Sequence, residues 1–163
     1  MYIVFMKKKE AVAVLVDIRS THNVGAIFRT SDACGVSKIY LAGYTPAPVD
    51  RFGRSRADVA KSALGAEKTI NWEVVANISN IIKKLHKDGF KIIAIEQSLN
   101  SIDYKKIKID DKVAFVVGNE VTGLPENILK KCDLVAEIPM LGEKESLNVS
   151  VAFGVAVFRM LNI

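Results

Sequence analysis

The run IPMLGEKESLNVSVAFGVAVF, from Ile138 to Phe158, decides how the last part of this chain folds. An apolar, strand-like segment stops at Pro139 and a polar loop follows it. Asn148 is expected to start a helix as its N-cap, because an asparagine side chain accepts hydrogen bonds from the unpaired amides of a first turn. The helix is apolar on nearly every side, so it must be buried within the monomer or against a second chain. A polar loop held between two buried elements is suited to hold a ligand.

Apolar, β-branched segments alternate with helical patterns along the rest of the chain. Strands are expected at 12–16, 38–42, 68–71, 91–95, 113–117 and 134–138, and helices at 24–34, 58–64, 73–87, 125–130 and 148–161. Strands that are apolar throughout and separated by helices indicate a parallel sheet covered on both faces. The 163 residues suit one core, and no repeat or linker divides them. The sequence therefore predicts a single α/β domain over residues 1–163, with a mostly parallel sheet and helices on both faces.

Size and composition exclude several classes of protein. The longest apolar runs fall far short of the ~18 residues that a membrane helix requires. The N-terminal MYIVFM precedes the lysines at 7–9, which is the reverse of the order in a signal peptide. Cys34 and Cys132 are too few for a disulfide scaffold, so a reducing cytoplasm is the simplest location. His22 and His86 form no metal-ligand spacing, so no metal is expected.

The positive charge of the chain is concentrated in one segment. The net charge is +5, which alone says little about partners. Arg51, Arg54, Arg56 and Lys61, however, lie together around Gly53. A basic loop of this kind suits contact with a phosphate backbone. A solvated loop whose charges serve only solubility is the alternative.

Two motifs in the chain suggest a binding site. GNEVTGLP, Gly118 to Pro125, follows an apolar strand, and its glycines frame Glu120 in what should be a tight turn close to a ligand. The alternative is a structural turn before a helix. NVGAIFRTSDACG starts at Asn23 and places Arg29 in a mostly apolar helix, where it needs a carboxylate or phosphate partner. A structural ion pair is the alternative there.

Polar segments follow three of the expected strands, at 95–98, 118–123 and 139–148. Ligands of parallel α/β sheets bind beyond the carboxyl ends of the strands, so these segments are the expected site.

Taken together, the segments resemble the SpoU (TrmH-type) RNA ribose 2′-O-methyltransferases of the SPOUT superfamily. The matching motifs are N-V-G-A-I-F-R-T over Asn23–Thr30, G-N-E-x-x-G-L-P over Gly118–Pro125 and I-P-M-x-G-x-x-x-S-L-N-V-S-V-A over Ile138–Ala152. The resemblance covers the chain from about Val12 onward. It implies a deep trefoil knot near the C-terminus, a rare feature in proteins. It also implies S-adenosylmethionine as cofactor, tRNA or rRNA as substrate, and a homodimer with sites at the subunit interface.

The resemblance also implies roles for individual residues. The cofactor pocket would be lined by Ile95, Glu96, Gly118, Ile138, Met140, Ser146 and Leu147. Asn23 and Arg29 would face the acceptor ribose from the partner subunit, while Glu120, Ser146 and Asn148 would orient the loops and the reacting groups. Family mechanisms make the arginine a base. A guanidinium keeps its proton in proteins, so a cation that stabilises the developing alkoxide is the other possibility.

No appended RNA-binding domain is expected, because residues 1–10 are too short to form one. RNA would then be bound by the catalytic domain itself, through Arg51, Arg54, Arg56 and Lys61. A non-catalytic RNA-binding or assembly factor on the same scaffold is the alternative function. A flavodoxin-like small-molecule domain would explain the sheet but not the three motifs.

Overall fold

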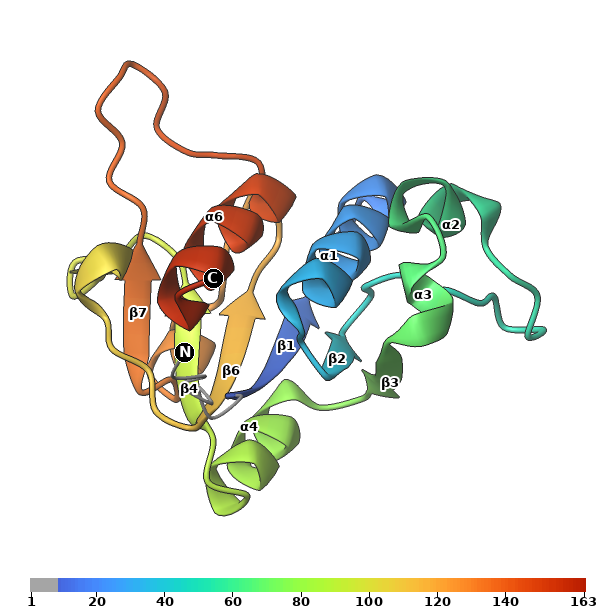
Figure 1. Cartoon of the computed structure of the whole chain (residues 1–163), viewed down its shortest axis with the longest axis horizontal. Helices are drawn as coiled ribbons and strands as arrows, with labels where there is room; N and C mark the ends of the chain where they lie inside the picture. The colour runs from blue at the N-terminus through green and yellow to red at the C-terminus, as the bar shows by residue number, and fades with distance from the viewer. Residues whose placement is uncertain (1–8) are drawn as a thin grey trace, which may run out of the picture.

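Seven strands form one parallel sheet in the computed structural model, which describes residues 9–163, and their order is β3-β2-β1-β6-β4-β7-β5 (Figure 1). The strands are β1 (Glu10–Val16), β2 (Lys38–Ala42), β3 (Asn71–Val75), β4 (Lys91–Ile95), β5 (Ile102–Asp103), β6 (Lys112–Val117) and β7 (Leu134–Glu137). All neighbouring pairs are parallel. The expected α/β architecture is confirmed.

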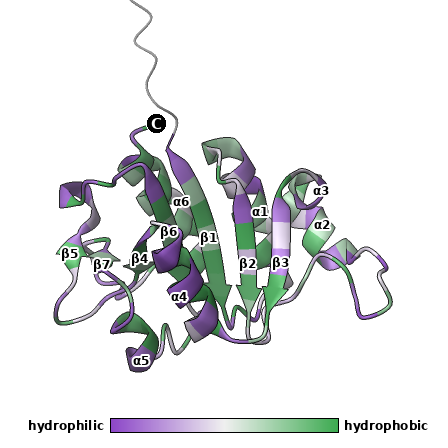
Figure 2. Ribbon diagram, turned by 90° about the horizontal axis from the view of Figure 1, so that it is seen from below, coloured by the Kyte–Doolittle hydropathy of each residue, from purple (hydrophilic) through white to green (hydrophobic). Residues whose placement is uncertain are grey.

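Helices cover both faces of this sheet, as predicted. They are α1 (Thr21–Cys34), α2 (Ala57–Ala63), α3 (Ala66–Thr69), α4 (Ile78–Lys87), α5 (Glu126–Leu129) and α6 (Val149–Leu161), with a 3₁₀ turn at Tyr104–Lys106. Leu15 and its neighbours on the same face of β1 pack against α1 and α6, whereas Val14 faces α4 and α5. The central strands are therefore apolar along most of their length (Figure 2).

The two helices that border the sheet's carboxyl edge are capped at their starts. The Asn148 Oδ1 accepts hydrogen bonds from the amides of Ser150 and Val151 at 2.9 and 3.4 Å, so the predicted N-cap of α6 is confirmed. Helix α1 begins three residues earlier than predicted, because Ser20 caps it and accepts from the Asn23 amide at 3.2 Å. It ends at Gly35, whose φ of 75° is left-handed.

The prediction was wrong between residues 66 and 77. Residues 66–69 form α3 rather than the start of a strand, and Asn71–Val75 is strand β3 rather than the start of a helix. Val74 and Ile78 have helical spacing, but pairing of β3 with β2 outweighs this local signal. Helix α4 starts only after Asn77, whose Oδ1 accepts from the Ser79 amide at 2.9 Å. The two-residue strand β5 was not predicted.

The described residues, 9–163, cover helix α6 on one side and leave the other side partly exposed. Phe153, Ala156 and Val157 are fully buried, whereas Val151, Val155 and Phe158 are 49%, 39% and 36% exposed. The exposed residues are spaced by four and three positions, so they form one apolar stripe along the helix. The described part of the monomer therefore does not bury the whole helix.

The trefoil knot, in which the C-terminal part of the chain passes through a loop formed by the chain itself, stays a prediction. The segment 1–8, on which the expectation about a signal peptide depends, lies outside the described residues. None of the helices within 9–163 has the length and apolarity that a bilayer crossing requires.

Candidate active site

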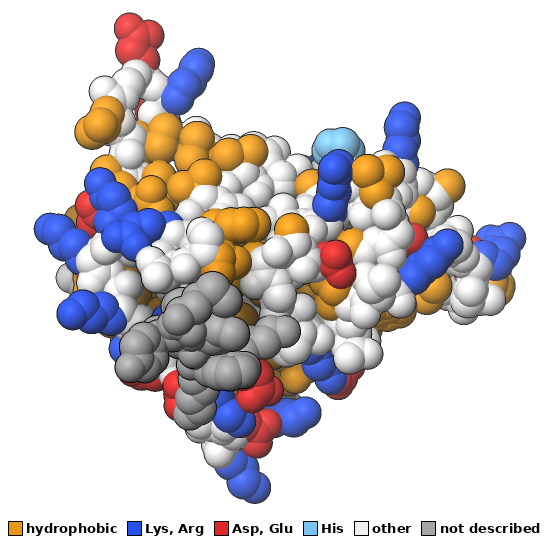
Figure 3. Space-filling view, in the orientation of Figure 1, with side chains coloured by type: hydrophobic (Ala, Val, Ile, Leu, Met, Phe, Trp, Pro, Cys, Tyr) orange, Lys and Arg blue, Asp and Glu red, His pale blue; other side chains and the backbone are white. Residues whose placement is uncertain are grey.

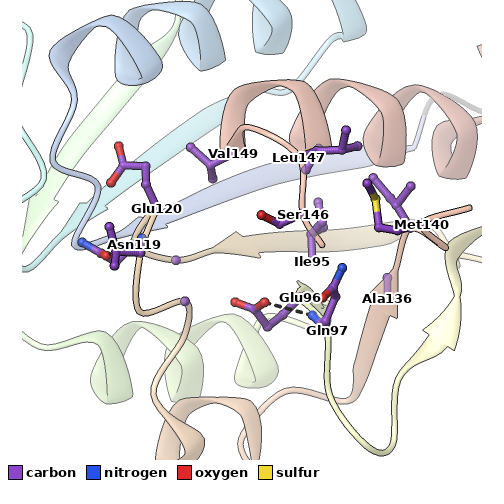
Figure 4. Close-up of a pocket in the computed structure, with 15 residues that line it drawn as sticks. Ile95, Glu96, Gln97, Asn119, Glu120, Ala136, Met140, Ser146, Leu147 and Val149 are labelled. Carbon is purple, nitrogen blue, oxygen red and sulfur yellow. Dashed lines mark hydrogen bonds between the residues drawn. The ribbon is translucent and has the colours of Figure 1, made fainter. Parts of the chain in front are cut away.

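A pocket lies at the carboxyl ends of β4, β6 and β7, beside the start of α6 (Figure 4). All seven residues predicted to bind a cofactor line it: Ile95, Glu96, Gly118, Ile138, Met140, Ser146 and Leu147. Gln97, Asn119 and Val149 line it as well and were not predicted. The sheet order changes direction between β1 and β6, next to this pocket, which is where parallel α/β sheets bind ligands.

Glu120 joins the loop after β6 to the start of α1. Its Oε2 accepts from the Arg19 amide at 3.0 Å, and its Oε1 accepts from the Ser20 amide at 3.0 Å and from the Asn23 Nδ2 at 2.9 Å. Partial burial tends to raise the pKa of Glu120, but these hydrogen bonds outweigh it and lower the pKa below its usual value. Glu120 is therefore held as a carboxylate that fixes the first turn of α1.

Asn23 carries this link on to the third motif. Its Oδ1 accepts from the Asn148 Nδ2 at 3.1 Å, while its own Nδ2 donates to Glu120. The Oδ1 of Asn148 is already occupied by the first turn of α6. The side-chain amides of Asn23 and Asn148 can each satisfy these partners in one orientation only. The network therefore fixes the orientation of both amides. A chain of hydrogen bonds, Glu120–Asn23–Asn148, thus connects residues from all three motifs.

Asn119 is a buried polar residue that the sequence analysis missed. Its Nδ2 donates to the Asp17 carbonyl at 2.9 Å and to the Tyr44 hydroxyl at 2.8 Å. Its Oδ1 accepts from the amides of Val121 and Thr122 at 2.8 and 2.9 Å. One side chain therefore shapes the turn after β6 and ties it to the loops after β1 and β2. Its place directly after an apolar strand, within GNEVTGLP, was the available signal.

Glu96 and Gln97 hold two of the pocket's loops. The Glu96 Oε2 accepts from the Leu124 amide at 3.0 Å, and its Oε1 accepts from the Gln97 amide at 2.9 Å (Figure 4). Gly123 has a φ of 66°, and a Cβ at that position would lie 2.4 Å from the Glu96 Oε2. The Gln97 Nε2 donates to the Glu145 carbonyl at 2.9 Å, which tethers the loop before α6.

The lining of the pocket suits a ligand that is partly flat and apolar and carries a positive charge. Ile95, Ile138 and Leu147 supply apolar walls. Glu96 and Glu120 supply carboxylates, and the lining residues within 9–163 include no Lys, Arg or His. S-adenosylmethionine combines an adenine ring with a sulfonium cation, so the residues present fit this cofactor. In the chain from residue 9 onward, no cluster of three or more His, Cys, Asp and Glu side chains is placed to hold a metal.

Arg29 lies outside this pocket. It is exposed on α1, six residues beyond Asn23, which is roughly 9 Å along the helix axis. No carboxylate of the described residues forms an ion pair with it. The structural ion pair considered as an alternative is therefore absent from the described part of the chain, and the guanidinium is available to a phosphate or a second chain.

The four basic residues predicted to contact RNA lie around and just beyond a loop at the opposite end of the long axis from the loop that precedes α6 (Figure 1). Arg54 pairs with Asp50 at 2.7 Å, and Arg56 pairs with Asp58 at 3.3 Å. Arg51 and Lys61 are exposed and have no ion pair within residues 9–163. The four cations are thus not equivalent in the free chain.

Sequence comparison relates this chain to bacterial RNA-modifying enzymes. It is 35% identical over 144 residues to the 23S rRNA (guanosine-2′-O-)-methyltransferase RlmB of Neisseria meningitidis serogroup B, covering 88% of this chain and 55% of that protein. It is 32% identical over 157 residues to a putative TrmH family tRNA/rRNA methyltransferase of Staphylococcus aureus, covering 94% and 60%. The chain therefore spans a little over half the length of these relatives.

Solved structures show the same fold. An AdoMet-bound rRNA methyltransferase from Sinorhizobium meliloti has a TM-score of 0.85 at 29% identity, covering 95% of this chain and 57% of that one. The A. aeolicus TrmH/SpoU tRNA modifying enzyme has a TM-score of 0.82 at 28% identity, covering 96% and 76%. The family model described as SpoU rRNA Methylase matches residues 10–158. With three motifs joined around one pocket and nearly the whole domain matched, this chain belongs to the SpoU rRNA methylase family.

Proposed function

We propose that this chain transfers a methyl group from S-adenosylmethionine to a ribose 2′-hydroxyl of tRNA or rRNA. The observation that carries the proposal is the Glu120–Asn23–Asn148 chain of hydrogen bonds. It links the start of α1, the turn after β6 and the start of α6 around one pocket with apolar walls and carboxylates. Named relatives act on rRNA or belong to a tRNA/rRNA methyltransferase family, which supports RNA as the substrate.

The bound cofactor supplies an electrophilic methyl group on its sulfonium. Ile95, Ile138 and Leu147 would enclose the adenine, and Ser146 lines the same pocket. Glu96 and Gln97 keep the surrounding loops in place through backbone contacts. The chain therefore contributes mainly positioning, which can supply most of the acceleration of a group transfer.

Arg29 would act on the acceptor hydroxyl from a second copy of the chain. Thr30, the residue after Arg29 on α1, lies beside α6. A Cβ added at Gly154 of α6 would be 3.5 Å from the Thr30 side chain. A copy that covered the apolar stripe of α6 would therefore bring Arg29 into the interface. The hydroxyl proton would leave to solvent. The guanidinium, which cannot readily give up its own proton and so act as the base, would stabilise the developing alkoxide and hold the adjacent phosphate. The homodimer, the trefoil knot and a cytoplasmic location are parts of this proposal.

The Arg29→Ala variant tests the proposal. We expect methyl transfer to fall by roughly 100- to 1,000-fold, because a preorganised charge at the reacting oxygen is lost. The affinity for S-adenosylmethionine should be unchanged, since Arg29 does not line the pocket. Tritiated methyl incorporation into total RNA measures the first and calorimetry the second. A wild-type chain that binds the cofactor and RNA without transferring methyl groups would instead be the non-catalytic RNA-binding factor.

A further inference from the structure

The loop between β2 and α2 has a defined structure. Val49 and Ser55 form an antiparallel bridge, and the Asp50 amide donates to the Arg54 carbonyl at 2.9 Å. The Gly53 amide closes the turn by donating to the Asp50 carbonyl at 3.0 Å, and Gly53 has the left-handed φ of 77° that this turn needs. We call residues 49–55 the basic hairpin.

Asp50 organises the tip of the basic hairpin. Its Oδ1 accepts from the amides of Phe52 and Arg54 at 2.8 and 3.0 Å, and its Oδ2 accepts from the Arg54 Nε at 2.8 Å. These bonds, led by the one from the Arg54 side chain, lower the pKa of Asp50. The tip is thus held by hydrogen bonds within the basic hairpin itself.

This tip presents an aromatic ring to solvent. Phe52 is 67% exposed, although phenylalanine side chains are usually buried in the core. The guanidinium carbons of Arg51 and Arg54 lie 4.7 and 5.1 Å from the centre of its ring. In the space-filling view, Lys and Arg side chains lie around the whole outline of the molecule, this end included (Figure 3). A ring bordered by two cations is the combination with which proteins bind unpaired nucleotides.

We propose that Phe52 stacks on an unpaired RNA base while Arg51 contacts the phosphate beside it. This inference rests on the proposed RNA substrate. Arg51 is the cation of this tip without an ion pair in the described chain, whereas Arg54 is paired with Asp50. An exposed cation–π contact contributes less free energy than base–aromatic stacking. An RNA base can therefore displace the Arg51 guanidinium from the Phe52 ring, and the guanidinium can then contact the phosphate.

Within one chain, the base bound at the basic hairpin would not be the nucleotide that is methylated at the pocket. The basic hairpin projects at one end of the long axis, and the loop that precedes α6 rises near the other end (Figure 1). Phe52 would therefore raise the affinity for RNA and set which RNA is bound. It would leave the methyl-transfer step itself unchanged, so its removal should raise KM for RNA and not lower kcat.

Substitutions at position 52 test this inference with a stem–loop RNA and a blunt duplex of equal length as probes. We expect Phe52→Ala and Phe52→Leu to weaken binding of the stem–loop by about five- to 150-fold, and Phe52→Trp to bind like wild type. The salt dependence of binding should stay unchanged in Phe52→Ala, whereas Arg51→Gln should reduce its slope by roughly 0.7. Phe52→Trp in a Trp72→Phe background should lose fluorescence with the stem–loop and not with the duplex.

The outcomes separate this inference from the proposed function. Stem–loop binding by Phe52→Leu as tight as wild type would overturn stacking, because an apolar contact would then suffice. Methyl transfer to RNA with an unchanged KM in Phe52→Ala would overturn the inference alone and would leave the exposed ring to a protein partner. A wild-type chain that neither binds nor methylates RNA would overturn both proposals.

Discussion

Single side chains at the carboxyl edge of the sheet each hold several loops. Glu120 accepts three hydrogen bonds from the start of α1, and Asn119 beside it uses its whole amide on four. A carboxylate that receives such bonds only in the folded chain links protonation to stability.

The stability of the chain should therefore depend on pH through Glu120. Its pKa is lowered on folding, so its stabilisation is complete above the unfolded value of about 4.3 and is lost as the pH falls through the lower folded value. We expect Glu120→Gln to cost roughly 1 kcal/mol at pH 7 and to flatten the decline of stability below about pH 4.5. Urea unfolding at a series of pH values measures both.

Glu126→Gln is the matched control for Glu120→Gln. The Glu126 side chain is 73% exposed and pairs with Lys130 on the surface of α5 at 3.6 Å. This variant should keep the wild-type dependence on pH. If both variants showed the same dependence, Glu120 would not be the group responsible.

At the level of residues, the sequence predicted which side chains lie together better than how they are connected. Asn23, Glu120 and Asn148 were chosen from motifs, and they do lie together. That Asn23 stands between the other two could not be predicted, because the amide of Asn23 meets Asn148 across 125 positions of sequence. Gln97 was missed for the same reason: its partner is the Glu145 carbonyl, 48 positions away.

Among the elements, α1 and α2 pack closely at a glycine of α1. A Cβ at Gly25 would lie 2.3 Å from the Val59 carbonyl oxygen and 3.0 Å from the Ala63 amide nitrogen. We expect Gly25→Ala to destabilise the fold by about 2 kcal/mol or more, although alanine is intrinsically the better helix residue. Thermal unfolding, monitored by circular dichroism, measures the change in stability.

Gly154 in α6 offers the matching control. A Cβ there would meet Thr30 at an ordinary contact distance of 3.5 Å. Gly154→Ala should therefore stabilise the chain by up to about 1 kcal/mol, the usual gain in a helix interior. Equal effects of the two substitutions would show that helix propensity, and not the contact with α2, governs Gly25.

Elements with a strong apolar pattern could be predicted from the sequence, whereas the strands at the edges of the sheet could not. The buried strands could be recognised by their continuous apolar runs. Such runs are expected because both faces of the sheet are covered. Strand β3 is largely exposed at the edge, so its sequence has no such signal and was assigned to a helix. Only its pairing with β2, which single-sequence patterns do not contain, makes it a strand.

For the whole molecule, the apolar stripe of α6 predicts assembly. Val151 and Val155 are partly exposed, so Val151→Glu with Val155→Glu should leave the monomer's core intact. We expect this double variant to sediment as a monomer with unchanged helical circular dichroism, and to transfer methyl groups poorly because Arg29 would no longer reach a partner's pocket. A dimer that survives both charges would place the interface elsewhere.

Mixing two inactive variants should test whether Arg29 acts on the other copy. Arg29→Ala keeps an intact pocket, and Leu147→Asp keeps the arginine but puts a charge into the pocket wall. Mixed dimers would combine one intact pocket with one intact arginine, so part of the activity should return. No recovery would mean that arginine and pocket must belong to the same chain.

The position of β1 in the sheet has a consequence for synthesis on the ribosome. One side of β1 pairs with β6, so that Val12 lies opposite Ala114, a residue translated about a hundred codons later. Until then this most apolar strand has a neighbour on one side only, β2. Pairings so distant in sequence form slowly, and an unpaired strand edge invites aggregation. We expect the nascent chain to need protection by chaperones until β6 has emerged.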